Sequence, residues 1–183
     1  MLSKQAQKVL LKIARETVEA LTRDQQPPDF QVEEQELQHE QGAFVTLKTN
    51  GRLRGCIGQF TADKPLWQVV QQMAVAAATQ DPRFAGNRIR PDELDQLQIE
   101  VSVLSKMKEM ENPLDIELGK HGIYVKHGFR TGCFLPQVAT ETGWDKEQFL
   151  SKCCHGKAGL APDAWKDEDT KVYSFTAQVI EED

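Results

Sequence analysis

The dipeptide Asn50-Gly51 constrains the fold most strongly, because it lies between two extended runs. Ala43–Thr49 (AFVTLKT) precedes it and Arg52–Gln59 (RLRGCIGQ) follows it. A two-residue hairpin turn needs positive φ at both central positions, and Asn followed by Gly meets that need at little steric cost. The sequence therefore predicts an antiparallel hairpin over residues 43–59.

The remaining elements alternate between helical and extended patterns. Helical spacing of apolar residues, with caps at Ser3 and Asp145, predicts helices over residues 3–23, 65–79 and 145–154. Alternation predicts strands over residues 97–105 and 171–180, and the runs 122–126 and 130–135 indicate a second hairpin around His127-Gly128. Because strands outnumber helices and adjoin through hairpins, we expect an α+β fold with a mainly antiparallel sheet, packed helices and two subdomains. The whole chain, 1–183, is expected to form a single domain in this sense.

An internal comparison suggests two related halves. When the chain is shifted by 77 residues, Gly51, Gly55 and Cys56 align with Gly128, Gly132 and Cys133. The candidate repeats are 42–85 and 119–162, each consisting of a hairpin with a Gly-Cys strand, followed by a helix. An ancient duplication explains this match, but so does a chance coincidence of glycines in two hairpins, since the strand before the turn slips by one or two residues.

Composition and charge exclude several classes of protein. The chain has 183 residues, 39% of them hydrophobic, and a net charge of −6. No apolar run is long enough for a membrane span, and the charged residues of the first helix argue against a signal peptide, so we expect a cytoplasmic location. No segment is dense in Lys and Arg, so nucleic-acid binding is not expected. No sequence feature specifies an oligomeric state.

The segment 52–60 (RLRGCIGQF) carries the strongest chemical signal. Strand alternation places Arg52, Arg54 and Cys56 on one face. Two guanidinium groups would stabilise the thiolate of Cys56, and they could hold a carboxylate or phosphate by bidentate hydrogen bonds. Gly55 and Gly58 would allow a ligand or a second backbone to approach closely. The segment therefore predicts a concavity for a small anionic ligand, with a thiol in it.

A structural role for the cysteine is the alternative. Cysteine is often buried as a small hydrophobic residue. A two-residue turn pairs Val45 with Cys56 and Leu47 with Arg54, so neither face of the hairpin is cleanly polar. Only a β-bulge at Gly55 would reset the alternation and decide which side chains are buried.

Three other residues are candidates for chemistry, each with a structural alternative. His121 would be a general base for Cys56, or a turn histidine bonded to the backbone. Asp81 and Arg83, in the turn DPRF, would orient a substrate, or cap local backbone and pair with each other. The run Cys153-Cys154-His155 indicates helix packing, because adjacent helical residues point about 100° apart and suit a shared metal poorly. We expect no metal and no cofactor.

The segment Leu53–Gly58 (LRGCIG) resembles the signature hexapeptide of the AMMECR domain family. Further stretches that match the family lie between roughly residues 40 and 180, among them DPRF, IEVSVLS, GKHG, FLPQVA, GWD and KAGL. The resemblance implies an α+β fold of two subdomains with the hexapeptide near a cleft. It implies no defined activity.

What the resemblance implies about partners concerns an enzyme system. Prokaryotic members are associated with a radical-SAM enzyme and with a Memo-like protein related to extradiol dioxygenases. This chain has no CxxxCxxC cluster motif of its own. Two hypotheses therefore stay open. One is an accessory component of that system with an anion-binding cleft, and the other is an enzyme with Cys56 as nucleophile, Arg54 as anion holder and His121 as base.

Overall fold

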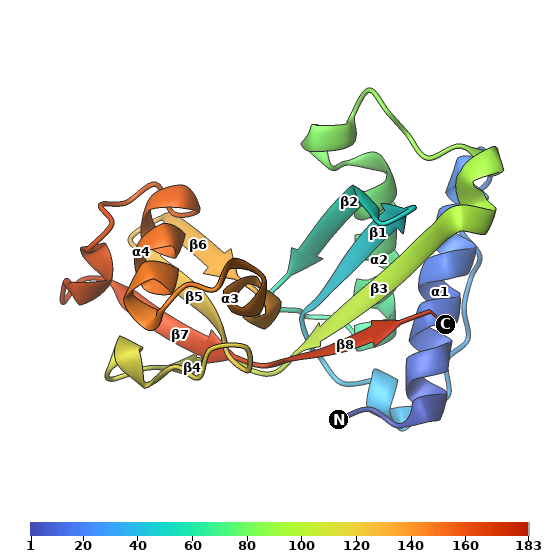
Figure 1. Ribbon diagram of the computed structural model, residues 1–183. Coiled ribbons are helices and arrows are strands. Elements are labelled where there is room, and N and C mark those ends of the chain that lie inside the picture. The colour runs from blue at the N-terminus through green and yellow to red at the C-terminus, as the bar shows by residue number, and fades with distance from the viewer. Residues whose placement is uncertain (183) are drawn as a thin grey trace. The chain divides into compact units, whose positions relative to one another are not determined.

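The computed structural model describes residues 1–182 and divides the chain into two compact units (Figure 1). Unit 1 comprises residues 1–104 together with the segment from residue 178 onward, and unit 2 comprises residues 105–177. Each unit contains a four-stranded sheet and its own cluster of buried apolar residues. The expected α+β fold with antiparallel sheets is confirmed.

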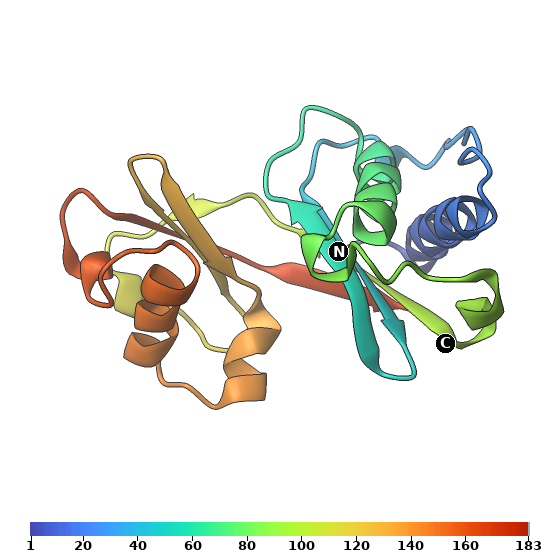
Figure 2. The same ribbon diagram turned by 90° about the horizontal axis from the view of Figure 1, so that it is seen from above.

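Unit 1 is a sheet with two helices on one face. Its strands follow the order β2-β1-β3-β8, and α1 and α2 pack against each other on the same side of the sheet (Figures 1 and 2). The helices and strands of this unit are α1 (Lys4–Thr22), β1 (Ala43–Thr49), β2 (Arg52–Gln59), α2 (Leu66–Thr79), β3 (Leu97–Leu104) and β8 (Ala177–Glu181). Short 3₁₀ helices lie at Gln35–Leu37, Pro82–Phe84 and Pro91–Gln96.

Local signals account for how these elements begin and turn. The Ser3 side chain accepts a hydrogen bond from the amide of Ala6 at 3.2 Å and so caps α1. Asn50 and Gly51 have φ values of +51° and +73°, as the hairpin turn requires. The hairpin predicted from the Asn-Gly pair is therefore confirmed, with the expected strand boundaries.

A β-bulge interrupts the hairpin immediately after its turn. Thr49 pairs with Arg52 and Lys48 with Leu53, but Leu47 pairs with Gly55. Two residues, Arg54 and Gly55, therefore lie opposite Leu47. A bulge of this kind shifts every following side chain by one position.

The bulge separates the arginines from the cysteine. Cys56 pairs with Thr46 and Arg52 pairs with Thr49, and these partners are three residues apart on β1. Since paired residues share a face and faces alternate along a strand, Cys56 and Arg52 lie on opposite faces of the sheet. The prediction that Arg52, Arg54 and Cys56 share one face is wrong, because it assumed a regular ladder.

Close packing explains why glycine stands at the bulge. A Cβ atom on Gly55 would lie 2.1 Å from the carbonyl oxygen of Ala77, near the end of α2. A side chain at this position would push the helix off the strand. The approach of α2 to β2 thus depends on Gly55.

Unit 2 repeats the sheet-and-helix construction. Its strands follow the order β4-β7-β5-β6, and α4 begins with a capping box between Asp145 and Gln148. The helices and strands are β4 (Lys108–Glu109), β5 (Gly122–His127), β6 (Arg130–Phe134), α3 (Pro136–Thr142), α4 (Lys146–Gly156) and β7 (Lys171–Phe175), with 3₁₀ turns at Pro113–Asp115 and Ala164–Lys166. Cys153 and Cys154 are fully buried in its core, and burial raises the pKa of both thiols. Their role is packing, as the sequence predicted.

The last predicted strand, 171–180, is in fact two strands. β7 belongs to unit 2 and β8 belongs to the sheet of unit 1. Between them, the amide of Thr176 donates to the hydroxyl of Ser105, and the carbonyl of Thr176 accepts from the amide of Ser105, both at 2.9 Å. The alternating pattern continues through Thr176, so the sequence gives no sign of the break.

Among the helices formed by residues 1–182, none combines the length and the hydropathy that a membrane crossing requires.

Candidate functional site

Cys56 lies on β2, which is an edge strand of its sheet, and an ion pair covers that edge. The amide of Cys56 donates to the Asp81 carboxylate at 2.9 Å, and its carbonyl accepts from Arg83 Nη2 at 3.4 Å. Both backbone groups of Cys56 are therefore satisfied by side chains, as a further strand would satisfy them. The turn DPRF closes the sheet edge at this residue.

Asp81 is the buried centre of this arrangement. Its side chain is 2% exposed, and it accepts from Arg83 Nε at 2.9 Å and from Arg83 Nη2 at 2.6 Å. These bonds to Arg83, with those from the amides of Cys56 and Arg83, lower the pKa of Asp81 to about 2 although burial opposes the shift. The carboxylate is thus ionised at neutral pH, and it also caps the 3₁₀ helix Pro82–Phe84.

The sulfur of Cys56 is half-buried and has a polar neighbour on each side. The Thr46 hydroxyl on β1 donates to Sγ at 3.3 Å. The Arg83 guanidinium, 55% exposed, is close enough that the Cys56 side chain contributes to raising the pKa of Arg83, after the larger effect of Asp81. The positive charge beside the thiol comes from Arg83, and the expectation that Arg52 and Arg54 would supply it is corrected by the bulge.

Arg54 is held on the other side of the strand, against the loop that leads to β3. Its guanidinium forms an ion pair with Glu93 and donates to the carbonyls of Asn87 at 3.2 Å and Arg88 at 3.3 Å. The side chain is only 10% exposed. Arg54 in turn lowers the pKa of Glu93, so this partner is a carboxylate at neutral pH.

Arg52 and Arg54 of β2 line a pocket of about 580 Å³. Three arginines and one glutamate leave its lining with a charge of +2, in a chain whose net charge is −6. The lining residues are Thr49, Asn50, Arg52, Arg54, Asn87, Arg90 and Glu93; we call this the arginine pocket.

Two polar atoms in the arginine pocket lack a partner within the described part of the chain. They are Nε of Arg54 and the hydroxyl of Thr49, and both are buried. Register places Thr49 and the bulged Arg54 on the same face of the hairpin, the face of Leu47. Buried polar groups are nearly always hydrogen-bonded in proteins, so a pair of orphans in one pocket indicates a missing partner.

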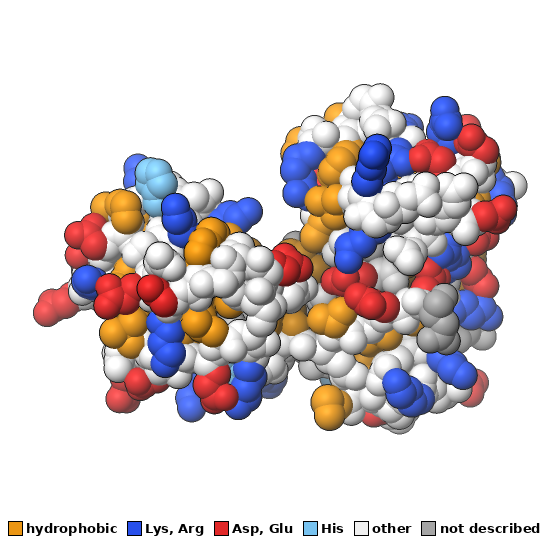
Figure 3. All heavy atoms as spheres, viewed as in Figure 1, with side chains coloured by type: hydrophobic (Ala, Val, Ile, Leu, Met, Phe, Trp, Pro, Cys, Tyr) orange, Lys and Arg blue, Asp and Glu red, His pale blue; other side chains and the backbone are white. Residues whose placement is uncertain are grey.

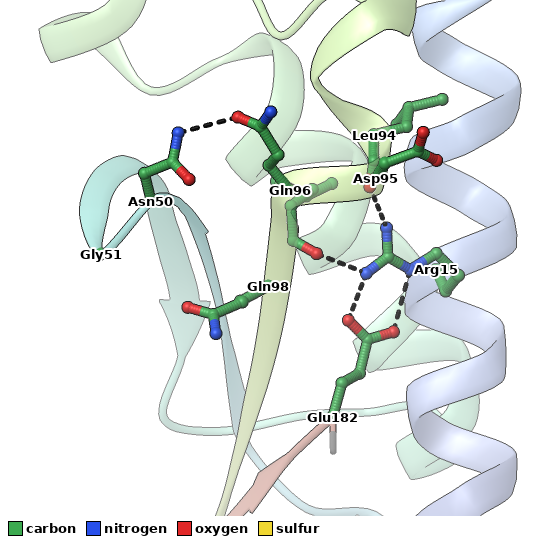
Figure 4. A pocket seen from close by; sticks show the side chains of 9 residues that line it. Arg15, Asn50, Gly51, Leu94, Asp95, Gln96, Gln98 and Glu182 are labelled. Atoms are coloured by element: carbon green, nitrogen blue, oxygen red, sulfur yellow. Dashed lines mark hydrogen bonds and ion pairs between the residues drawn. The ribbon is translucent and has the colours of Figure 1, made fainter.

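A second pocket, of about 690 Å³, is lined in part by Asn50 and Gly51 of the hairpin turn (Figure 4). Arg15 of α1 points into it, but the Glu182 carboxylate and the carbonyls of Leu94 and Leu97 already bind its guanidinium. The Asn50 amide donates to the Gln96 side chain at 2.7 Å. Since its arginine is fully engaged, this pocket offers less to an anion than the arginine pocket does.

Comparison with known proteins decides the family. A model of the AMMECR1 family matches residues 11–180. The chain belongs to the AMMECR1 family. It is 43% identical to a protein of Methanothermobacter thermautotrophicus, over the whole chain and 97% of that protein, and 45% identical to protein NEQ441 of Nanoarchaeum equitans, over 95% of the chain and 99% of that protein. A crystal structure described as that of the uncharacterized protein PH0010 from Pyrococcus horikoshii matches with a TM-score of 0.89 at 38% identity, covering all of this chain and 94% of the other.

In this AMMECR1-family chain His121 is a backbone-bonded turn residue. Its Nδ1 accepts a hydrogen bond from the amide of Glu117 at 3.1 Å, within unit 2. That is the structural alternative that the sequence left open. Cys56 belongs to unit 1, so the pairing of Cys56 with His121 as nucleophile and base stays a prediction.

The glycines of the segment 53–58 make room for the protein's own atoms. A Cβ on Gly58 would lie 2.2 Å from the Phe44 ring, just as a Cβ on Gly55 would meet Ala77. The close approach predicted at Gly55 is that of a second backbone. Neither position opens a cavity for a ligand by itself.

Charged side chains of both signs are interspersed over the face of the AMMECR1-family chain seen in Figure 3. The positive charge of the arginine pocket is thus a local feature.

Thr49, Asn87, Arg90 and Glu93 were missed from the sequence. Asn87, Arg90 and Glu93 lie in the irregular segment between α2 and β3, which shows no periodicity. The one usable signal was Gly55, since a glycine inside a strand marks a bulge and a bulge moves Arg54 to the face of Thr49.

Proposed function

We propose that this AMMECR1-family protein binds a small anionic ligand in the arginine pocket and serves as an accessory component of a radical-SAM and Memo-like enzyme system. The observation that carries the ligand site is the pair of buried donors, Arg54 Nε and Thr49 Oγ1, which have no acceptor among residues 1–182. Leaving a buried donor unpaired costs about 1–3 kcal/mol. A ligand that supplies an acceptor to either donor would remove that cost.

The lining favours binding over covalent catalysis. It offers guanidinium, amide and hydroxyl donors, and its one carboxylate, Glu93, is engaged by Arg54. It contains no thiol, because the bulge directs Cys56 to the other face. A pocket of this kind suits a component that holds a ligand for a partner enzyme.

Calorimetric titration with sulfate tests the anion site. Sulfate is a simple dianion that needs only charge and donors. We expect binding by the wild-type protein and weaker binding by Arg52→Gln, about tenfold for one charge-assisted hydrogen bond lost. Arg88→Gln removes a neighbouring charge outside the lining and serves as the matched control. Equal loss in both variants would mean that general charge, and no defined pocket, attracts the anion.

The partnership is tested separately by co-purification. The untagged Memo-like and radical-SAM proteins from the same source should be retained on the tagged chain, in a ratio that a second purification step preserves. If neither is retained by the wild-type protein, with or without anion, the accessory role is wrong even where the anion binds.

A cysteine-dependent enzyme is the second candidate, and one observation favours it. Cys56 Sγ is half-buried and accepts from the Thr46 hydroxyl at 3.3 Å, and Arg83 Nη2 donates to the Cys56 carbonyl at 3.4 Å. Labelling of the native protein by iodoacetamide tests this candidate. Rapid modification of Cys56 below pH 7, ahead of the equally half-buried Cys133, supports an activated thiol, and labelling only after denaturation refutes it.

A further inference from the structure

The proposed arginine pocket has a donor arrangement that distinguishes between anions. Resting on the proposed function, we infer that its ligand is a phosphomonoester, a small polar molecule whose dianionic phosphate lies among Arg52, Arg54, Arg90 and Thr49. The inference depends on where the donors come from, on the charge they carry and on how firmly they are held.

The donors come from three separate segments. Thr49 is on β1, Arg52 and Arg54 are on β2, and Arg90 is in the loop before β3. A carboxylate presents two oxygens whose lone pairs lie in one plane, so its hydrogen-bond donors approach mainly within that plane. A phosphate presents three acceptor oxygens in a tetrahedral array and takes hydrogen bonds from several sides at once. A pocket with donors on several sides fits the phosphate better.

The charge of the lining matches a dianion. Its three arginines and Glu93 leave +2 at neutral pH. Glu93 does more than subtract charge, because one oxygen pairs with Arg54 while the other accepts from the Arg90 amide at 2.9 Å and lies 4.0 Å from Arg90 Nε. The Glu93 carboxylate therefore contacts both Arg54 and Arg90.

Arg54 is preorganised for this ligand. Its side chain is 10% exposed and is fixed by Glu93 and by the carbonyls of Asn87 and Arg88, which leaves Nε as the donor without a partner. Arg54 is thus already desolvated and ordered when the chain folds, so ligand binding does not bear these free-energy costs. A ligand that needs no such ordering binds more tightly for the same contacts.

The volume leaves room for an organic group beyond the phosphate. About 580 Å³ lies within the range of small-molecule sites. Apart from the charged side chains and Thr49, the lining consists of two amides, Asn50 and Asn87. Amide side chains favour hydroxyl or carbonyl groups, so the remainder of the ligand is polar.

The pH dependence of binding tests the phosphate itself. Inorganic phosphate is mainly dianionic at about pH 8 and mainly monoanionic at about pH 5.5, whereas sulfate keeps two charges at both. The charged groups facing the site are Arg52, Arg54, Arg90 and Glu93, with Asp92 paired to Arg90 from outside, and the hydrogen bond from Arg54 lowers the pKa of Glu93. We expect phosphate affinity to fall by about tenfold on acidification while sulfate affinity stays constant, and acetate to bind at neither pH.

Two threonine variants separate a ligand contact from a structural role. Thr49→Val removes the unpaired hydroxyl and keeps the shape, so we expect an unchanged melting temperature and phosphate affinity lower by about fivefold or more. Thr46→Val, on the opposite face, is the matched control and should leave phosphate affinity unchanged. Either of two results overturns the phosphate inference alone. One is that sulfate or acetate binds as tightly as phosphate at both pH values, and the other is that Thr49→Val keeps full phosphate affinity. No binding of any of the three anions overturns the proposed function as well.

Discussion

The hairpins of the two units place a glycine at the same structural point, where the second strand meets the C-terminal end of a helix, α2 in unit 1 and α4 in unit 2. A Cβ on Gly55 would collide with the carbonyl of Ala77, and a Cβ on Gly132 would lie 2.6 Å from the amide nitrogen of Ala158. The turn glycines, Gly51 and Gly128, both have positive φ. The strand orders also correspond, since β6-β5-β7-β4 repeats β2-β1-β3-β8. These likenesses favour the duplication of 42–85 and 119–162, which stays a prediction.

The two hairpins share a backbone arrangement but differ in their register and in their charged side chains. The pairing of β5 with β6 is regular throughout, whereas β1 and β2 contain the bulge that turns Arg54 towards the arginine pocket. The shift of 77 also places Ala158 and Leu160 where unit 1 has Asp81 and Arg83. Unit 2 therefore forms its hairpin and packs it against a helix without a counterpart of the bulged Arg54 or of the Asp81–Arg83 pair. Their presence in one unit alone supports a functional role for them.

The largest effect is expected from substituting the two packing glycines. Gly55→Ala should lower the free energy of unfolding by about 3 kcal/mol, because backbone atoms 2.1 Å away must move. Gly132→Ala should cost about 2 kcal/mol, since its nearest atom is 2.6 Å away. Chemical denaturation followed by circular dichroism measures both.

Gly86→Ala and Gly156→Ala are the controls, because a Cβ at either position meets nothing within 4 Å. They should change the free energy of unfolding by no more than about 1 kcal/mol. A neutral Gly132→Ala beside a damaging Gly55→Ala would break the correspondence between the two hairpins.

The next effect concerns the ion pair that only unit 1 has. Asp81→Asn should lower the free energy of unfolding by about 2 kcal/mol at neutral pH, because buried bonds to Arg83 and to the Cys56 amide lose their charged acceptor. The pKa of Asp81 is lowered from 3.8 to about 2, so its stabilisation is complete above pH 3.8 and is lost as pH falls towards about 2. The difference between wild type and variant, measured by denaturation at each pH, should shrink over that window. A difference that does not depend on pH would show that the charge is not what stabilises the edge.

The smallest effect is on the rate of thiol modification. Arg83→Gln should slow the labelling of Cys56 by iodoacetamide about threefold at neutral pH, because it removes the charge beside the sulfur. Arg52→Gln should leave the rate unchanged, since the bulge places Arg52 on the opposite face. Mass spectrometry of the labelled peptide measures both rates, and a slower rate in Arg52→Gln would contradict the separation of the two sites.

Most of the fold could be predicted from local sequence signals. The features that could not be predicted depend on contacts between residues far apart in the sequence. Asn50 and Gly51 predicted both strands of the first hairpin, because a turn depends only on its own residues. The bulge follows from the approach of Ala77, which lies more than twenty residues beyond Gly55. The break at Thr176 likewise depends on hydrogen bonds to Ser105.

The candidate site was predicted in part for the same reason. The arginines and the cysteine were recognised from the segment itself, and the alternative roles of Asp81 and Arg83 as cap and partner are what the structure shows. The prediction that Arg54 lies beside the Cys56 thiol is wrong, because the bulge changes the register of β2 against β1. Glu93, which fixes Arg54, comes from the short 3₁₀ helix Pro91–Gln96, and its contact with Arg54 joins residues far apart in the sequence.

A crystal structure of the protein with selenate, located by its anomalous scattering, tests most directly whether the anion site belongs to Arg54 or to Cys56. We expect a selenium peak in the arginine pocket, within hydrogen-bonding distance of Arg54 Nε and the Thr49 hydroxyl. A peak beside Arg83 and Cys56 with none in the arginine pocket would contradict it.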